Sequence, residues 1–340
     1  MVKFTDYLYY YPRVEKLQRG MLGATIFIVK GEHGQFMLDP GVLGGKVEKH
    51  YERLMEKDGI NVHDCQAIFI THCHPDHMVA AHYWQNKIQS SRTGEKIPIY
   101  VHPQGARYLK DPDQLLQDLL KEAGWIRKEI SKLPPDLGDS MFALLWTKPQ
   151  PIEFYLELQD NQVFDLGNVI IRAEFTEGHS LNHVAYRLIE KQTEKSILLS
   201  GDLISFKELE KGKGIHALAS VNTVISDFSK ELSSLKRILN DPPDVLFTSH
   251  YGIHEPKELV VQRFKEAIDL AETYKPRVLE YLKMGPKRFG QINKHLIYFK
   301  HYLSGYATRT STTYVVLREL MNDGLVKEID KKKHVFALAQ

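Results

Sequence analysis

Three histidines and one aspartate fall within six residues of this chain, in the segment Thr71-His72-Cys73-His74-Pro75-Asp76-His77. An apolar core cannot absorb all of these side chains, because each buried imidazole needs a hydrogen-bond partner and the charged forms repel one another. The apolar run 67–71 just before them is typical of a strand buried on both faces. The sequence therefore predicts a cluster of polar ligands where a core strand ends.

The spacing of this cluster indicates metal binding. In an extended segment His72 and His74 project to the same side and can bind one cation. Asp76 and His77 lie on the turn into the next helix and can reach a second cation. Imidazole nitrogen and carboxylate oxygen, without thiolate, suit zinc or iron, and manganese less well. The alternative is a histidine-rich surface turn that binds metal weakly by chance.

Three further polar clusters follow predicted strands. Each is weak alone, because a lone histidine or a Gly-Asp pair is usually structural. Together they stand at the carboxyl ends of short buried strands, where open α/β sheets place their sites. We therefore predict a layered α/β core with one shared site. The clusters are Gly178-His179-Ser180, Ser200-Gly201-Asp202 and Ser249-His250-Tyr251-Gly252.

These motifs in this order resemble the metallo-β-lactamase superfamily over roughly residues 20–273. Asp39-Pro40-Gly41 also matches the early Asp-x-Gly turn of that family. The resemblance implies a four-layer αββα sandwich and two divalent metal ions, with zinc preferred and iron or manganese as alternatives. It implies one metal at His72, His74 and His179, a second at Asp76, His77 and His250, and Asp202 as the bridge between them.

The resemblance also implies hydrolysis, in which a metal-bound hydroxide attacks a carbonyl or phosphorus centre. We assign the catalytic role to Asp76, which either orients the nucleophile and shuttles its proton or serves as a ligand alone. His183 either supports a ligand by a hydrogen bond or is an ordinary strand histidine. Cys73 is expected to point away as a small buried hydrophobe. The chain departs from the family at Met78-Val79-Ala80-Ala81, where Gly-Gly is usual, and this bears on helix packing rather than on the ligands.

The C-terminal residues differ in charge from the rest. Residues 275–340 contain 13 Lys+Arg and 5 Asp+Glu, so the first 274 residues carry a net charge of −6 in a chain of +2. Three predicted helices, the third at 314–321 with Thr308–Thr313 as capping residues before it, and a β-hairpin resemble a winged helix. We predict a catalytic domain at 1–274 and a winged-helix-like domain at 275–340.

Lys331-Lys332-Lys333, Arg309 and Arg318 could contact phosphate. We favour a solvated or packed basic face instead, because an acidic body repels a long nucleic acid. The residue pattern of the segment 104–160 predicts a mainly helical, aromatic-rich insertion. It either caps the metal cleft over a small substrate or forms a homodimer interface.

The leading hypothesis is hydrolysis of a small ester, thioester or lactone, similar to the glyoxalase II-like members. The alternatives are a metal-dependent ribonuclease or phosphodiesterase acting on single-stranded RNA, a DNA-binding regulator, and iron-dependent oxygenation of a thiol, which leaves Asp76, His77 and His250 without a role. Two cysteines, the lack of an apolar run of about 20 residues and a start without signal-peptide character predict a cytoplasmic protein that does not span a membrane.

Overall fold

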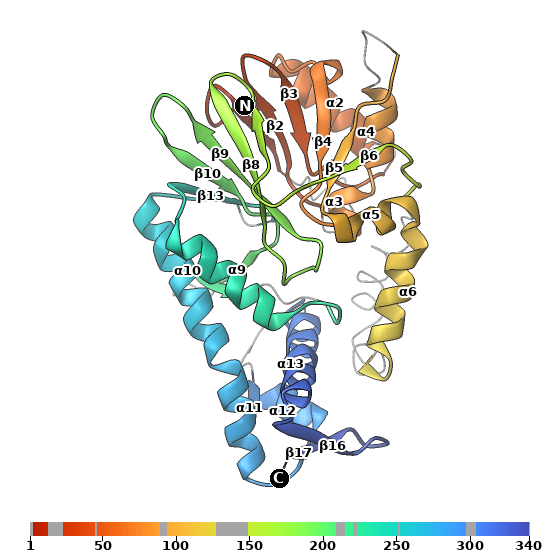
Figure 1. Ribbon diagram of the computed structural model, residues 1–340, viewed down its shortest axis with the longest axis vertical. Helices are drawn as coiled ribbons and strands as arrows, with labels where there is room; N and C mark the ends of the chain where they lie inside the picture. The colour runs from red at the N-terminus through yellow and green to blue at the C-terminus, as the bar shows by residue number, and fades with distance from the viewer. Residues whose placement is uncertain are drawn as a thin grey trace.

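The computed structural model describes residues 3–12, 23–44, 46–88, 94–126, 149–208, 215–219, 223–250, 252–296 and 304–339. Two sheets of six described strands each form the upper half of the molecule in Figure 1. The first has the order β1 (Leu8–Tyr11), β2 (Ile26–Lys30), β3 (Gln35–Leu38), β4 (Cys65–Phe69), β5 (Ile99–Val101) and β6 (Tyr155–Glu157). The second has the order β14 (Gly252–His254), β13 (Val245–Thr248), β10 (Ser196–Leu199), β9 (Val184–Glu190), β8 (Val169–Phe175) and β7 (Val163–Asp165).

The two sheets pack face to face over an apolar core. Because side chains alternate along a strand, every second residue of the central strands faces the other sheet. Phe69 on β4 lies 5.3 Å from Tyr186 on β9, measured between ring centroids. Phe27 on β2 lies 5.7 Å from Phe247 on β13. These aromatic contacts close the middle of the sandwich.

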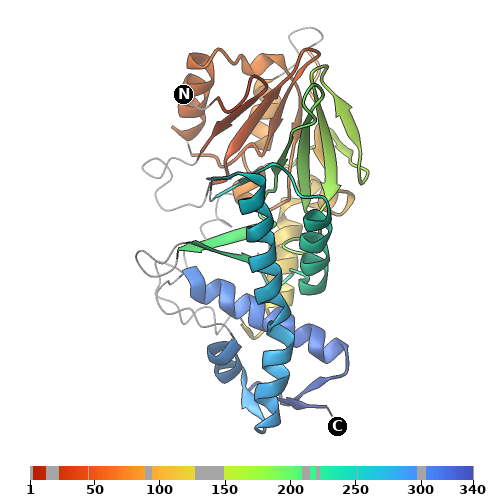
Figure 2. The ribbon, with the colours of Figure 1, turned by 90° about the vertical axis from the view of Figure 1, so that its left-hand side faces the viewer.

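Helices cover both outer faces. On the first sheet Met55 of α2 (Val47–Lys57) and Trp84 of α4 (Ala81–Lys87) are buried in one apolar cluster with strand residues, and α5 (Pro103–Lys110) adds Leu109. On the second sheet α9 (Phe228–Asn240) and α10 (Lys257–Glu272) do the same. Figure 2 shows the two sheets side by side in the upper half of the molecule. The layers confirm the predicted αββα class.

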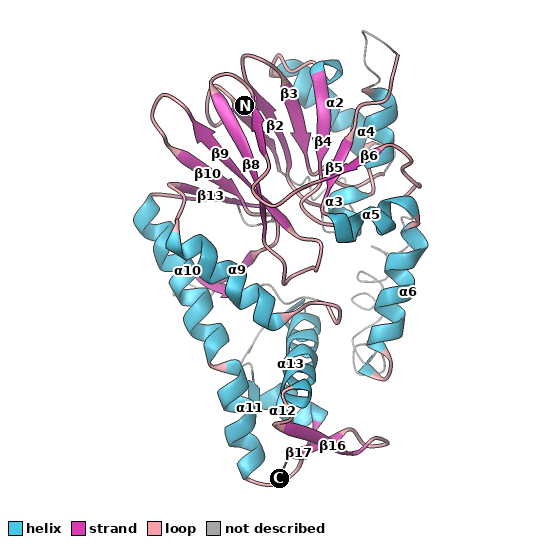
Figure 3. Cartoon of the chain, in the orientation of Figure 1, coloured by secondary structure: helices cyan, strands magenta, loops and turns pink. Residues whose placement is uncertain are grey.

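The described residues after α10 form three helices and a small sheet, in the lower half of Figure 3. The helices are α11 (Tyr274–Lys283), α12 (Phe289–Leu296) and α13 (Ser304–Asn322), and the sheet has the order β15 (Lys287–Arg288), β17 (Val335–Leu338) and β16 (Val326–Asp330). They share one apolar cluster with α9 and α10. The winged-helix assignment and the boundary at residue 274 stay predictions.

The prediction that Thr308–Thr313 cap a helix starting at Tyr314 is wrong, because α13 begins at Ser304 and contains them. Mid-helix hydroxyls usually compete with backbone hydrogen bonds. Here two of the hydroxyls are buried and bonded to α12: Thr313 Oγ1 donates to Asn293 Oδ1, and Asn293 Nδ2 donates to Thr310 Oγ1, both at 3.0 Å. Small hydroxyl residues therefore serve as packing against α12.

The segment 104–160 is helical at its start, where α6 (Pro112–Ala123) follows α5, and residues 127–148 of it lie outside the described residues. Its end differs from the prediction, because β6 pairs in parallel with β5 and belongs to the sheet. Just beyond α6, Trp125 stacks on His334 at 3.7 Å between ring centroids. The segment thus contacts the C-terminal residues.

The remaining described elements are short. They are a 3₁₀ turn at Val62–Asp64, α3 (Pro75–Met78) and the hairpin of β11 (Ile204–Glu208) and β12 (Ile215–Ala219). Within the ranges given above, no helix is long and apolar enough to cross a bilayer.

We expect Phe247→Ala to lower the free energy of unfolding by about 3–5 kcal/mol, because it leaves a cavity among Phe4, Tyr10 and Phe27. Urea denaturation of the metal-free protein measures this change. The matched control is Phe154→Ala at an aromatic side chain that is 42% exposed, and it should stay within about 1 kcal/mol. Equal losses in the two variants would contradict the assigned core.

Candidate metal centre

Four segments bring polar side chains to one edge of the sandwich. His72 follows β4, His179 follows β8, Asp202 follows β10 and His250 follows β13, each within four residues of the strand's end. Strands β8, β10 and β13 run in the same direction, since β9 is antiparallel to β8 and β10 and β13 is parallel to β10. Their carboxyl ends therefore meet at one edge, as the sequence predicts.

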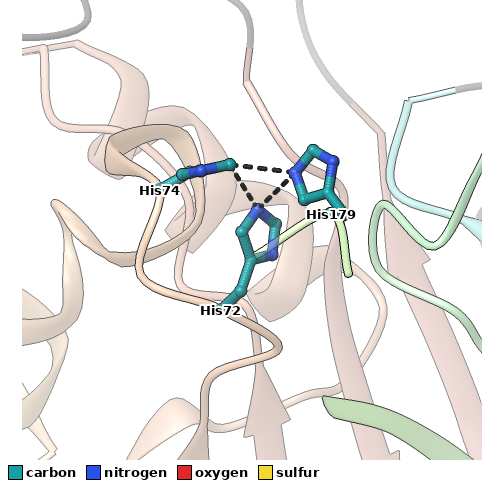
Figure 4. A group of neighbouring side chains, drawn as sticks. All are labelled: His72, His74 and His179. Carbon is teal, nitrogen blue, oxygen red and sulfur yellow. Dashed lines mark hydrogen bonds between the residues drawn. The ribbon is translucent and has the colours of Figure 1, made fainter. Parts of the chain in front are cut away.

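His72, His74 and His179 point their ring nitrogens at one another (Figure 4). His74 Nδ1 lies 2.8 Å from His72 Nε2 and 2.9 Å from His179 Nε2, and the two Nε2 atoms are 3.2 Å apart. A neutral imidazole has one N–H, so three nitrogens in mutual contact cannot all be satisfied by each other. Two ligands of one tetrahedral zinc ion stand about 3.3 Å apart. The three nitrogens fit such an ion.

A second group lies beside the first and consists of Asp76, His77 and His250. His250 Nε2 lies 3.3 Å from Asp76 Oδ2. His77 Nε2 is buried and has no hydrogen-bond partner among the described residues. A buried nitrogen in that state is unusual in a protein without an ion and fits a cation.

Asp202 lies between the two groups. Its Oδ1 is 3.3 Å from His250 Nε2, and its Oδ2 is 3.6 Å from His77 Nε2 and 3.7 Å from His179 Nε2. One carboxylate thus reaches ring nitrogens of both groups. Of the seven residues, His74, Asp202 and His250 are partly exposed, and the other four are buried.

The two groups differ in electrostatics. Burial and the neighbouring imidazoles lower the pKa of His72 well below its usual value and that of His74 to about 3, so both rings are neutral. Burial opposes ionisation of Asp202, but His250 and His77 hold its pKa well below the usual range. Burial would lower the pKa of His250, but Asp202 and Asp76 raise it to about 10. Without a metal the carboxylates draw protons to this side, and a divalent cation can replace those protons.

The buried carboxylate of Asp39 supports the second group. Its Oδ1 accepts the Thr71 backbone N–H, and its Oδ2 accepts the Thr71 hydroxyl, both at 2.8 Å. The same Oδ2 lies 2.8 Å from His77 Nδ1. This bond keeps the Nδ1 proton on His77 and turns Nε2 toward Asp76 and Asp202. Sequence reasoning identified the Asp-Pro-Gly turn but not this contact.

His183 contacts the segment that carries Asp202. Its Nε2 accepts the Asp202 backbone N–H at 3.1 Å, so Nδ1 carries the proton and donates to Thr176 Oγ1 at 2.8 Å. Gly201 has φ +54°, and an added Cβ would lie 2.7 Å from His183 Nε2. The ring therefore packs where a side chain at position 201 cannot.

Cys73 and the residues that replace the usual Gly-Gly are buried. The thiol of Cys73 lies 3.5 Å from the Gly105 carbonyl oxygen, and burial raises its pKa, in line with a packing residue. Met78, Val79 and Ala80 are each at most 1% exposed, and the Ala80 N–H donates to the Gly41 carbonyl at 3.0 Å. The larger side chains pack into the core beside the centre. Tyr251 lies outside the described residues.

Known proteins share this fold. A metallo-beta-lactamase family protein from Thermus thermophilus aligns with a TM-score of 0.69 and 18% identity, covering 99% of this chain and 100% of that one. A beta-lactamase domain protein from Burkholderia ambifaria has the same TM-score, 16% identity, and coverage of 99% and 93%. An uncharacterized protein of Mycobacterium tuberculosis is 24% identical over 213 residues, which cover 59% of this chain and 80% of that protein.

The sequence model of the metallo-beta-lactamase superfamily matches residues 19–250. That range contains all six residues of the two groups, Asp202 between them, and both sheets except β1 and β14. Divalent metal binding is implied by this family, and the grouped histidines and aspartates could hold the metal. The protein belongs to the metallo-beta-lactamase superfamily and is a metallo-hydrolase.

Proposed function

We propose that this hydrolase is dinuclear and acts on a small ester, thioester or lactone. The observation that carries the proposal is the position of Asp202, whose two oxygens reach ring nitrogens of both groups. Two cations held close together repel each other, and a shared carboxylate offsets that repulsion.

In this proposal one ion is bound by His72, His74 and His179. The second is bound by the group of Asp76, His77 and His250. Zinc suits a donor set of imidazole nitrogen and carboxylate oxygen. When bound, the ions would supply water that ionises near neutral pH and positive charge that stabilises an oxyanion.

The protein's own residues then orient the reaction. Asp39 holds the proton on Nδ1 of His77 and leaves Nε2 free to bind. His183 holds the backbone that carries Asp202. Asp76 Oδ2 lies 3.3 Å from His250 Nε2 and 3.6 Å from His77 Nε2, so its carboxylate would stand beside a bound ion, where it could orient a water molecule and accept its proton.

Two observations favour a small substrate. The basic turn Lys331–Lys333 lies at the far end of the molecule from α3, which carries Asp76 and His77 (Figure 1). The first 274 residues carry a net negative charge, which repels a polyanion.

The metal content tests the two-ion proposal. We expect about two equivalents of zinc per chain, and about one in each of His179→Ala and His250→Ala, because each variant removes a ligand from a different group. Ester and thioester turnover should fall by about a hundredfold or more in both. Elemental analysis and activity assays measure these changes. A wild type that retains a single ion after zinc saturation would contradict the proposal.

Asp39→Asn tests the orientation of His77. The asparagine oxygen can still accept the Thr71 N–H, but its amide would donate to His77 Nδ1 and move the ring proton to Nε2. Asparagine also tolerates the φ of 48° found at this position. We expect affinity for the second ion to fall about 10- to 100-fold, measured by calorimetric zinc titration. Asp269→Asn, on the exposed face of α10, is the control, and equal affinity in both variants would refute the role of Asp39.

Charge reversal in the basic turn Lys331–Lys333 distinguishes a small-molecule substrate from RNA. The side chains of Lys331, Lys332 and Lys333 are exposed, so changing all three to glutamate should leave the fold intact. We expect thioester turnover to stay within about twofold, because screened charges beyond about 10 Å act weakly. Salt-dependent RNA cleavage that the triple variant loses would favour the ribonuclease instead.

A further inference from the structure

The loop that carries His179 rests on the start of α9. A Cβ added to Gly178 would lie 2.2 Å from the Glu231 Cα atom, so loop and helix are in direct backbone contact. The Asp227 N–H donates to the Gly178 carbonyl at 2.8 Å. The His179 N–H donates to Glu231 Oε2 at 2.6 Å. The first turn of α9 thus fixes the position of this loop.

Ser226, just before α9, holds the other backbone group of His179. Its hydroxyl is buried and donates to the His179 carbonyl at 2.8 Å. Both the N–H and the carbonyl of His179 are therefore bonded to residues 226–231. A shift of this segment would move the His179 ring relative to His72 and His74.

Two consecutive side chains of α13 hold the same segment from the other side. The Arg318 guanidinium donates to the carbonyls of Val224, at 2.7 Å, and Ser226. Glu319 accepts the Ser229 N–H at 3.0 Å, at the N-terminal end of α9 where a carboxylate is favourable. Glu122 of α6 lies 2.7 Å from Arg318 and fixes the guanidinium. Charge-assisted bonds of this kind are strong and directional.

We propose that Arg318 is a positioning residue for His179. The geometry of the metal centre then depends on the C-terminal residues, although they do not contact the ion. The contacts run from Arg318 to Ser226 and from Ser226 to His179. The inference rests on the proposed function, in which His179 is a ligand. Loss of Arg318 should lower the affinity for the ion at His72, His74 and His179. It should leave the affinity for the ion of the second group unchanged.

Cobalt titration of the full-length, metal-free protein, followed by visible absorption, tests this. Two backgrounds isolate the two groups: His250→Ala leaves the group that contains His179, and His74→Ala leaves the other. Adding Arg318→Ala should weaken cobalt binding about tenfold or more in the first background and less than about twofold in the second. Arg288→Ala, at an exposed arginine on β15, is the matched control and should change neither affinity.

Two milder variants follow the same route and guard against misfolding of Arg318→Ala. Arg318→Lys should recover only part of the cobalt affinity. The lysine keeps the positive charge, but its ammonium cannot bond two carbonyls in the fixed geometry of a guanidinium. Ser226→Ala should lower the affinity for the same ion, because it removes the hydrogen bond to the His179 carbonyl. Equal weakening in both backgrounds, or no change in either, would overturn the role of Arg318. A wild type that binds no cobalt would overturn the proposed function itself.

Discussion

The buried carboxylate of Asp39 joins the fold to the metal centre. It stands just after β3 and bonds both the backbone and the hydroxyl of Thr71, just after β4, so it ties two neighbouring strands together where they end. A charged group that is fully buried is costly unless donors surround it, and here the third donor is His77. The interaction that satisfies Asp39 is therefore also the one that orients a proposed ligand. The same three residues therefore join two strand ends and orient the proposed ligand.

The rest of the centre follows from strand direction. Because the relevant strands end at one edge, loops of a few residues are enough to bring distant parts of the chain together. The cost is an accumulation of imidazoles and carboxylates in a place with little water. In the metal-free protein, neutral His72 and His74 face a side where Asp202 and Asp76 draw protons onto His250. Divalent cations resolve both problems at once, because they accept the lone pairs and neutralise the carboxylates.

Sequence patterns predicted the layered α/β core and the polar clusters at strand ends, because short buried strands and dense polar motifs leave strong local signals. The αββα sandwich and the division of the residues into two groups followed from the family resemblance. The strands that precede His72, Gly178, Ser200 and Ser249 all lie where these motifs predict them. The patterns failed where packing overrides local preference. Threonine and serine favour helix ends in isolation, but Thr310 and Thr313 lie inside α13 and are bonded to Asn293. The contacts of Asp39 and Arg318 join residues far apart in the chain, and one sequence has no signal for such pairs.

The role of the C-terminal residues cannot be inferred from their charge alone. A basic tail suggests a detachable nucleic-acid-binding module, but α11 and α13 contribute Val278, Val316 and Leu320 to the cluster that also covers the second sheet. Deleting residues 275–340 would expose that apolar surface and remove Arg318 together with Lys331, Lys332 and Lys333. Loss of activity after such a deletion would say nothing about RNA. Because the basic turn is exposed and the contacts of Arg318 lie on a different element, point changes can separate a role in binding from a role in building the centre.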